Sequence, residues 1–514
     1  MNRKGKDINH STDIDKLPLN LYRAEQVRAL DRVAIEAQGM SGFTLMRRAG
    51  KAAFRILLEA YFGIEGHKLE KITVVCGTGN NGGDGYVIAT LARQHGIDIE
   101  VIQCGDAAKI NGDALQARQL AEQDGVSIAA FNGELTVASG VIVDALLGTG
   151  LSGEVRGVPA QAIAAINRLG LPVVAIDIPS GLCSDTGQVL GEAVYAEHTV
   201  SFIGLKQGLL TGAGPDYTGR LHYADLSVPE RVFKQVAASA ERLDLNALKS
   251  LLPPRQATAH KGQFGHLMVT GGDSGMAGAA AMASQAACRV GAGLISCATR
   301  PEHISAIVSR CPEVMVHGVI SGQEIEPLLA LATVVVIGPG LGRGSWGEQL
   351  LQQVFTLSVP LVVDADALNI LAAGRVVKTP YRDNWILTPH PGEAARLLSC
   401  TVAAVQRDRF AAVTELQRRY GGAVILKGAG TLVADNENPL PGLCYYGNPG
   451  MASGGMGDVL SGVLGALLAQ GLSPAAAARL GTCLHACAGD LAAVDGVRGL
   501  VATDLIPPLR TLIN

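Results

Sequence analysis

KITVVCGTGNNGGDG, at residues 71–85, decides the fold of the first half of the chain. Ile72–Cys76 is an apolar run of strand length, and the glycine-rich loop after it leads into a helical pattern at residues 86–96. Further steps of strand, loop and helix follow at residues 140–153 and 171–182. Apolar strands that alternate with helices are typical of a parallel sheet with helices on both faces. The sequence therefore predicts a doubly wound, Rossmann-like α/β domain.

A second series of the same kind begins at GHLMVTGGDSG, residues 265–275, and ends in a small-residue helix after GNPGMASGGMGD, residues 447–458. This series predicts a second doubly wound α/β domain. Residues 227–243, between the two series, are polar, as is typical of a domain boundary. We expect a flexible tail at 1–20, an N-terminal domain at 21–228, a linker at 229–242 and a C-terminal domain at 243–514. In the first domain, Tyr22–Tyr61 shows a helical pattern that breaks near Gly39–Gly42.

The composition excludes several classes of protein. The 514 residues include 64 glycines, only 4% are aromatic and 17% charged, and the net charge is −4. No basic block offers a footprint for nucleic-acid phosphates, and aromatic residues are too few for base stacking. The N-terminus shows no apolar signal segment, and glycines and a proline interrupt the longest uncharged stretch, Val459–Ala478, which predicts a buried helix and a turn. We expect a cytoplasmic protein that binds neither nucleic acid nor membranes.

The ten cysteines form no CxxC pair, which favours reduced thiols. Cys483 and Cys487 stand close together in CLHAC. That pentapeptide is either a metal site or part of a core helix of small residues.

Polar residues follow the strands of the first domain. Asp144 and Asp177 stand at the ends of two strands, and Asn81 and Ser180 stand in the loops beside them. Because the carboxyl ends of parallel strands meet at one edge of a sheet, these four residues are expected to share that edge. Their oxygens form a donor set for a hard cation, and the low charge of the set favours a monovalent one. Each Asp alone could instead cap a helix or a turn, and the glycine loop could be a tight turn.

In the second domain, glycines at 450–457 precede an uncharged helix, so free amides and the helix dipole form an anion hole for a transferring phosphoryl group. Asp458 either takes a proton from an attacking hydroxyl or only matches the dipole. Residues 427–431, KGAGT, end a strand and could cradle a nucleotide phosphate. His390, between two prolines, either contacts a ligand or shapes a turn. Asp364 and Asp366 could hold Mg²⁺ or cap a turn.

CGTGNNGGDGYVIA, VDALLGTGLSGEVRG and DIPSGL resemble motifs of the YjeF N-terminal family, the NAD(P)H-hydrate epimerases, over about residues 21–226. The resemblance implies interconversion of the R and S forms of NAD(P)H that carry water at C6 of the nicotinamide ring. It implies K⁺ ligands at Asn81, Asp144 and Ser180. Substrate contacts are implied at Asn80, Asn81, Gly82, Gly83, Asp84, Gly148, Thr149, Gly150, Leu151, Ser152, Gly153, Glu154 and Asp177. Asp177 is the candidate acid or base, and Lys206 is a second candidate unless it is a surface or capping residue.

GDSGMAGAA, GPGLG, DADALN, TPHPGEAARLL, KGAGT and GNPGMASGGMGDVLSG resemble the ribokinase-like superfamily, and most closely its NAD(P)H-hydrate dehydratase branch, over about residues 243–513. The resemblance implies that phosphorylation of the C6 hydroxyl makes it a good leaving group, with Asp458 as base and backbone amides around the phosphoryl group. Mg²⁺ would accompany the nucleotide, and the fused layout favours ADP. Substrate contacts are implied at Ala277, Gly342, His390 and Asp458, and nucleotide contacts at Lys427, Gly428, Ala429, Gly430, Thr431 and Gly457.

Together the two resemblances predict a bifunctional metabolite-repair enzyme that acts on NADHX and NADPHX, the hydrates of NADH and NADPH, at the expense of ADP. We also expect a homo-oligomer. One alternative is a small-molecule kinase, for a vitamin or sugar, with an N-terminal binding module. Another is an N-terminal domain that serves only for binding or dimerisation.

Overall fold

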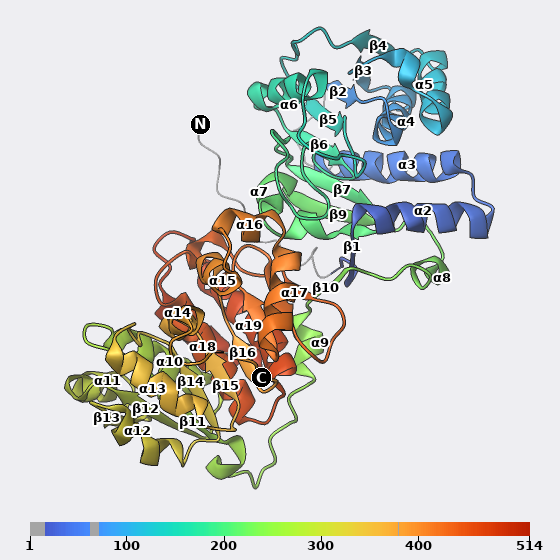
Figure 1. Cartoon of the computed structure of the whole chain (residues 1–514). Helices are drawn as coiled ribbons and strands as arrows, with labels where there is room; N and C mark the ends of the chain where they lie inside the picture. The colour runs from blue at the N-terminus through green and yellow to red at the C-terminus, as the bar shows by residue number, and fades with distance from the viewer. Residues whose placement is uncertain (1–15, 62–70, 379) are drawn as a thin grey trace. The chain divides into compact units, whose positions relative to one another are not determined.

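The computed structural model describes residues 16–61, 71–378 and 380–514. The chain divides into two compact units, one ending at Ala240 and the other spanning Glu241–Asn514 (Figure 1). Residues 1–15 lie outside the described residues. They include most of the predicted tail and the segment in which we expect no signal peptide. The first strand, β1 (Asn20–Tyr22), begins at the last residue of that predicted tail.

The N-terminal unit is built on a seven-stranded sheet with the order β4-β3-β2-β5-β6-β7-β9. All neighbouring strands in it run parallel, and the register places Val75 beside Asp144 and Asp144 beside Ala175. The strands are β2 (Lys71–Cys76), β3 (Asp98–Gln103), β4 (Ser127–Ala130), β5 (Val141–Ala145), β6 (Val173–Ile176), β7 (His198–Phe202) and β9 (Arg220–Ala224). A short strand, β8 (Leu205–Lys206), pairs with β1. The predicted doubly wound α/β class is confirmed.

Helices cover both faces of this sheet. Side chains that alternate along β2 enter two different cores, Val74 with the helices α2 to α5 and Val75 with α6, as the period of two in a strand requires. The helices are α2 (Ala24–Gln38), α3 (Gly42–Tyr61), α4 (Asn80–Gln94), α5 (Gly112–Gln123), α6 (Val158–Leu169), α7 (Gly214–Thr218) and α8 (Glu230–Phe233). The break near Gly39 is confirmed, since Gly39 ends α2 with a φ of 61°. The helix predicted from residue 86 instead begins at Asn80, so the glycine loop is shorter than expected.

The C-terminal unit has a larger sheet, with the order β13-β12-β11-β14-β15-β16-β17-β18-β19-β10. The strands from β13 to β17 run parallel, whereas β17, β18 and β19 form an antiparallel meander. The strands are β10 (Ala240–Arg242), β11 (His266–Thr270), β12 (Leu294–Thr299), β13 (Met315–Gly318), β14 (Val334–Ile337), β15 (Leu361–Val363), β16 (Trp385–Leu387), β17 (Ala423–Leu426), β18 (Thr431–Ala434) and β19 (Gly442–Cys444). The segment expected as a linker, 229–242, contains α8 and β10, and β10 pairs with β19.

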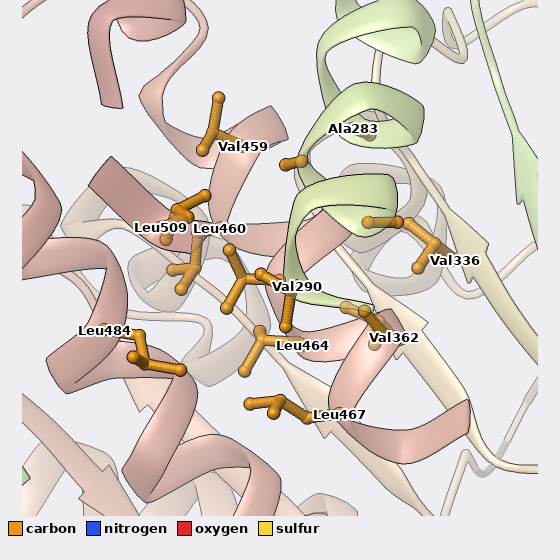
Figure 2. Close-up of a cluster of buried hydrophobic side chains, with 14 of the residues drawn as sticks. Ala283, Val290, Val336, Val362, Val459, Leu460, Leu464, Leu467, Leu484 and Leu509 are labelled. Atoms are coloured by element: carbon orange, nitrogen blue, oxygen red, sulfur yellow. The ribbon is translucent and has the colours of Figure 1, made fainter. Parts of the chain in front are cut away.

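A nearly all-apolar helix, α18, packs in the hydrophobic core of the second unit, and Figure 2 shows Leu464 and Leu467 of this helix within the core. After Asp458 it carries no charged residue, and Leu464 and Leu467 are fully buried, as a helix surrounded by protein requires. A Cβ atom on Gly465 would lie 2.5 Å from Cγ2 of Val336, so this glycine lets the helix approach β14. The helices of this unit are α9 (Leu245–Lys249), α10 (Ala277–Val290), α11 (Ile304–Arg310), α12 (Gly322–Leu329), α13 (Ser345–Phe355), α14 (Ala365–Ala373), α15 (Pro391–Leu398), α16 (Val402–Arg407), α17 (Arg409–Tyr420), α18 (Met456–Ala469), α19 (Pro474–Ala492) and α20 (Ile506–Ile513).

Candidate active sites

The N-terminal unit contains a cavity of about 840 Å³. The ends of β2, β5 and β6 reach it, as expected for a ligand site at the carboxyl edge of a parallel sheet, and α2 and α3 add side chains. Of the substrate contacts implied by the resemblance, the residues that line the cavity are Asn80, Asn81, Asp84, Gly148, Thr149, Gly150, Leu151, Ser152 and Asp177. Lys206 lines it as well.

Four of the implied contacts do not line the cavity. Gly82 and Gly83 are buried in the first turn of α4, where a Cβ on Gly82 would lie 2.2 Å from the carbonyl oxygen of Gly77. These two glycines therefore let the helix start pack closely. Gly153 has a φ of 78°, and Glu154 is exposed and forms an ion pair with Arg156 at 2.9 Å.

Asp177 and Lys206 form an ion pair inside the cavity. The Lys206 side chain is completely buried, and its ammonium also donates to the carbonyl oxygen of Phe202 at 3.0 Å and to Oγ of Ser201 at 3.3 Å. The alternative that Lys206 is a surface residue is therefore wrong. Asp177 has a φ of 68°, in the left-handed region that a non-glycine residue adopts at a cost of about 1–3 kcal/mol. This strained backbone holds its carboxylate towards Lys206 and the cavity.

Asp144 and Ser180 are fully buried beside the cavity and bind each other. The hydroxyl of Ser180 donates to Oδ1 of Asp144 at 2.6 Å, and its amide donates to Oδ2 at 2.8 Å. Burial raises the pKa of Asp144 to about 6, although the bonds from Ser180 lower it. Asn81 is not bonded to this pair, and both polar atoms of its buried amide lack a hydrogen-bond partner. A carboxylate, a hydroxyl and an orphaned amide oxygen suit a hard cation of low charge.

Asp31, on α2, is a cavity residue that the sequence analysis missed. Burial raises its pKa to about 6, with Lys206 lowering it and Asp177 raising it. The pKa of Asp84 is likewise raised, first by burial and then by Asp177 and Asp31. A charged residue in the apolar stripe of α2, between Val27 and Ile35, was the available sequence signal.

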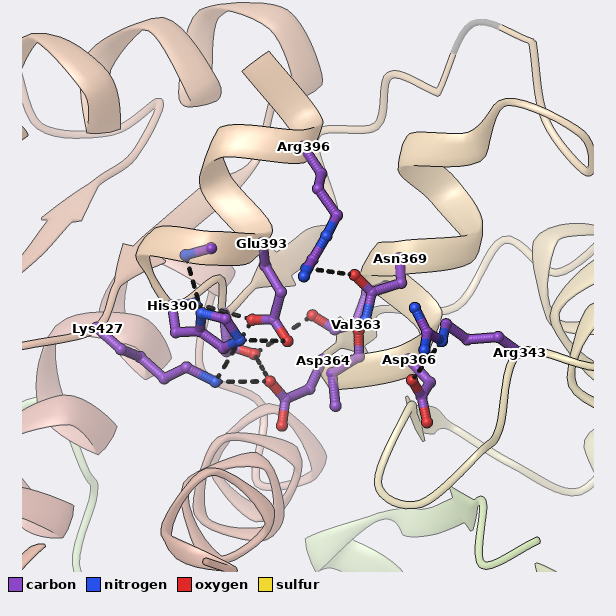
Figure 3. A network of polar contacts seen from close by, with 12 residues as sticks. Arg343, Val363, Asp364, Asp366, Asn369, His390, Glu393, Arg396 and Lys427 are labelled. Carbon is purple, nitrogen blue, oxygen red and sulfur yellow. Dashed lines mark hydrogen bonds and ion pairs between the residues drawn. The ribbon is translucent and has the colours of Figure 1, made fainter. Parts of the chain in front are cut away.

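In the C-terminal unit, Asp364 is the centre of a buried polar network (Figure 3). Its Oδ1 accepts from Oγ1 of Thr388 at 2.6 Å and from Nζ of Lys427 at 3.0 Å, and its Oδ2 accepts from Oγ of Ser461 at 2.8 Å. Burial would raise the pKa of Asp364, but Lys427 and these hydrogen bonds together lower it. This carboxylate therefore has its partners within the protein. The described residues contain no group of three His, Cys, Asp or Glu side chains placed to hold a metal ion.

Asp458 stands in the first turn of α18, next to Gly457. Burial raises its pKa to about 7, with a further rise from Asp364 and a lowering by Lys427. A carboxyl that titrates near neutral pH suits a general base. A Cβ on Gly457 would lie 3.2 Å from Nζ of Lys427, so the start of α18 and the KGAGT segment meet here.

His390 is the N-cap of α15 and so shapes the turn before this helix, while its ring stays about half exposed. Its Nδ1 accepts from the amide of Gly392 at 2.9 Å, while Glu393 accepts from the amide of His390 at 2.8 Å. Burial raises the pKa of Glu393 to about 7 although Lys427, whose Nζ lies 4.0 Å from Oε2, lowers it. His390 is therefore linked through Glu393 and Lys427 to Asp364 (Figure 3).

The remaining implied contacts lie at the starts of helices and in tight turns. Asp366 accepts from the amide of Gly342 at 3.0 Å, and Gly342 has a φ of 70°. Ala277 begins α10, and the carbonyl oxygen of Met276 beside it lies 2.8 Å from where a Cβ of Gly340 would be. The Gly340–Gly342 turn therefore sits against the start of α10 and against Asp366.

Arg409, which sequence reasoning missed, supports the implied nucleotide segment. Its buried guanidinium donates to the carbonyl oxygens of Leu426 at 3.2 Å and of Lys427 and Gly430 at 3.4 Å. A Cβ on Gly428, whose φ is 140°, would lie 2.9 Å from Nη1 of Arg409. Arg409 therefore fills one side of the turn at residues 427–430 and occupies the carbonyl oxygens that face that side. An arginine at the start of an amphipathic helix gave no sequence signal for this role.

The CLHAC stretch belongs to α19. Cys483 is fully buried, and Nε2 of His485 lies 2.9 Å from the carbonyl oxygen of Met456. The core-helix alternative describes this segment. Among the described residues, no helix is both long and apolar enough to span a membrane.

Comparison with known proteins gives matches along the whole chain. Residues 42–208 match the family described as YjeF-related protein N-terminus, and residues 267–510 match the family described as NAD(P)H-hydrate dehydratase. The chain is 48% identical to the bifunctional NAD(P)H-hydrate repair enzyme Nnr of Coxiella burnetii, over 96% of this chain and 99% of that protein. It is 46% identical to the enzyme of the same name from Vibrio cholerae, over 97% and 99%.

A solved structure of the ADP/ATP-dependent NAD(P)H-hydrate dehydratase of Bacillus subtilis, co-crystallised with ATP and Mg²⁺, is 28% identical to this chain. It covers 54% of this chain and 98% of its own, with a TM-score of 0.49. With nearly half of its residues identical to a full-length relative, this chain belongs to the family of bifunctional NAD(P)H-hydrate repair enzymes.

Proposed function

We propose that the N-terminal unit epimerises NAD(P)H hydrate at C6 and that the C-terminal unit dehydrates the S form to NAD(P)H at the expense of ADP. The observation that supports this proposal is that each unit brings charged motif residues of one activity close together. The first unit has the cavity with Asp177 and Lys206, and the second has Asp458 beside Lys427. NADHX and NADPHX are the proposed substrates.

In the epimerase unit, Asn80, Asp84 and the loop at 148–152 line the cavity, which supports a role for them in binding the dinucleotide. Asp177 is the proposed acid or base at the hydrated ring. K⁺ fits the oxygens of Asn81, Asp144 and Ser180, since the amide of Asn81 is buried and unpaired. When bound, this cation would supply positive charge that fixes the two loops following β5 and β6. The buried carboxylate of Asp144 would gain a partner as well.

In the dehydratase unit, Asp458 removes the proton from the C6 hydroxyl, which attacks the terminal phosphoryl group of ADP and releases AMP. The amides of residues 454–457 stabilise the phosphoryl group in transfer. The lone pair of the ring nitrogen then expels phosphate from C6, and C5 loses a proton, which restores NAD(P)H. Residues 427–431 and Gly457 are the proposed nucleotide contacts, and Ala277, Gly342 and His390 the substrate contacts.

The oxygen donors of the C-terminal site limit how the protein itself can bind Mg²⁺. Asp364 is occupied by Lys427, Thr388 and Ser461, and the described part of the chain offers no cluster of three acidic or histidine ligands. Phosphate oxygens of the nucleotide would therefore be the main ligands of Mg²⁺, in the way that is usual for this ion. The homo-oligomer and the cytoplasmic location stay predictions from the sequence.

The test is to incubate the chain with purified S and R hydrates of NADH, with ADP and with ATP in parallel. The absorbance of NADH at roughly 340 nm should recover from the S form at once and from the R form with a lag set by epimerisation. No recovery from the S form with either nucleotide would overturn the dehydratase assignment. A stable phosphorylated product from an added vitamin or sugar alcohol would favour the kinase alternative instead.

A further inference from the structure

One face of α2 forms part of the cavity wall. Val27, Arg28, Asp31 and Ile35 are its lining residues, and Val27, Asp31 and Ile35 follow each other at intervals of four, on one side of the helix. Asp31 thus places a carboxyl between two apolar side chains on the inside of the cavity. The other acidic residues of this helix, Glu25 and Glu36, are exposed.

Asp31 differs from Asp177 in its partners. Asp177 is ion-paired with the buried ammonium of Lys206 and also accepts from the amide of Phe202 at 3.3 Å. Within the described residues, the carboxyl of Asp31 has neither a hydrogen bond nor an ion pair. The cavity therefore holds one carboxylate fixed by a cation, while Asp31 offers it a carboxyl without such a partner, as does Asp84 from α4.

Burial favours the protonated form of Asp31, and among the charges around it Lys206 opposes this effect while Asp177 adds to it. The groups that act on it are Lys206 and Asp177, and Asp84 from α4 interacts with both carboxyls. Lys206 is already paired, so an ionised Asp31 would add a like charge to a partly buried cluster. Burial, with the contribution of Asp177, raises the pKa of Asp31 to about 6, so a minor fraction of the carboxyl is protonated at neutral pH and more of it below.

Epimerisation at C6 needs two proton transfers. The hydroxyl must leave as water, which requires a proton donor, and water must return to the other face of the ring, which requires a proton acceptor. Two carboxyls in different environments, supplied by different elements, can divide these tasks. Asp31 comes from α2 and Asp177 from the turn after β6.

We propose that Asp31 is the second proton-transferring carboxyl of the epimerase site and acts with Asp177. This proposal rests on the proposed epimerase function. Asp31 gives its proton to the C6 hydroxyl, the C6–O bond breaks with its electron pair leaving in water, and the lone pair of N1 forms the C6=N1 bond. Water then adds to the opposite face, Asp177 takes its proton, and the C6=N1 pair returns to N1. The proton gained by Asp177 is exchanged with solvent for the one lost by Asp31.

The test compares the wild-type chain with Asp31→Asn, Asp31→Glu and, as a matched control, Glu25→Gln on the exposed side of α2. Conversion of purified R hydrate is measured above the rate without protein, in the presence of ADP. We expect kcat for R consumption to fall by about 100-fold or more in Asp31→Asn, the scale of general acid–base catalysis, with KM within about threefold. Asp31→Glu, which keeps the carboxyl, should recover at least about tenfold of this loss, and Glu25→Gln should match the wild type.

Two further readings keep the outcomes distinct. The S form should be dehydrated at the wild-type rate by every variant, and thermal unfolding should show that the variants are folded. An Asp31→Asn chain that consumes R hydrate at the wild-type rate would overturn the role of Asp31. So would a loss in Asp31→Asn that appears in KM alone, or an unchanged dependence of kcat on pH between 5 and 8. A wild-type chain that does not consume R hydrate faster than buffer would instead overturn the epimerase function.

Discussion

Nζ of Lys427 lies 3.0 Å from Oδ1 of Asp364, and this contact joins the end of β17 to the start of α14. The carboxylate is fully buried, and the hydroxyls of Thr388 and Ser461 complete its hydrogen bonds. Because its charge is balanced within the protein, Asp364 is a structural residue of the site. It helps to hold Gly457 and Asp458, at the start of α18, in place.

Replacing Lys427, the cationic partner of Asp364, should therefore destabilise the second unit. Lys427→Met would leave a buried carboxylate without its partner, which costs about 3–5 kcal/mol in the free energy of unfolding. Denaturant unfolding measures this loss, and Lys261→Met, at an exposed lysine of the same unit, is the control. A loss below about 1 kcal/mol would contradict the importance of the pair.

Replacement of the proposed base should separate the two activities. Asp458→Asn keeps the shape of the side chain but cannot accept a proton, so dehydration of the S form should slow by at least about 100-fold. Recovery of NADH absorbance measures this step, and R-to-S conversion by the same protein should be unchanged. Asp495→Asn, an exposed carboxylate of the same unit, should behave as the wild type. Dehydration that persists in Asp458→Asn would refute the role of this residue.

The dehydration rate should depend on pH through Asp458. Its pKa is raised to about 7, and only the ionised form can take a proton from the substrate. The rate should thus be constant above that value and fall tenfold per pH unit well below it. Glu393 also has a pKa of about 7, so Glu393→Gln identifies the titrating group. The fall in rate at low pH should persist in Glu393→Gln. If it disappears in that variant, the titrating group is Glu393 and not Asp458.

Removal of K⁺ should affect the first unit alone. Exchange of K⁺ for tetramethylammonium, which is too large for the oxygens of Asn81, Asp144 and Ser180, should slow R-form consumption and lower the unfolding temperature of that unit. At K⁺ tenfold above its Kd, the lost stability is about 1.4 kcal/mol. Asp144→Asn should abolish this response to K⁺. An equal response in the wild type and in Asp144→Asn would place the cation elsewhere.

Overpacking of the central helix should destabilise the second unit without touching either site. In Gly465→Ala the new methyl group would lie 2.5 Å from Val336 and 2.9 Å from Leu267, so the unfolding free energy should fall by about 1–3 kcal/mol. Gly278→Ala in α10 meets no atom within 4 Å and should be neutral or stabilising. Equal effects of the two substitutions would contradict the close approach of α18 to β14.

Local patterns were enough to predict the α/β class, the strands around Cys76 and Asp144, and the helix break near Gly39. They also predicted site roles for Asp177 and Asp458, because each follows a strand or opens a helix within a short motif, and Asp177 does line the cavity. The sequence could not show that Lys206 is buried against Asp177, or that Asp364 and Lys427, 63 residues apart, pair with each other. Those relationships depend on how distant segments pack.

Asp31 and Arg409 show the same limit from the other side. Arg409 lies in a helix whose pattern gives no signal, and Asp31 gives only the weak one of a charge in an apolar stripe. What each side chain faces, the cavity for Asp31 and the turn at Gly428 for Arg409, depends on what its helix packs against. The start of α4 at Asn80 was mispredicted because glycines are poor helix formers in isolation. Close approach to Gly77 and Met46 compensates at Gly82 and Gly83.

The division of one chain into two compact units at Ala240 and Glu241 has a consequence for the relative amounts of the two activities in the cell. Since a single polypeptide carries both units, they are made in a fixed one-to-one ratio, whatever the level of expression. The capacity to convert the R hydrate thus rises and falls in step with the capacity to consume the S hydrate. No separate control of two genes is needed to keep the unusable epimer from accumulating.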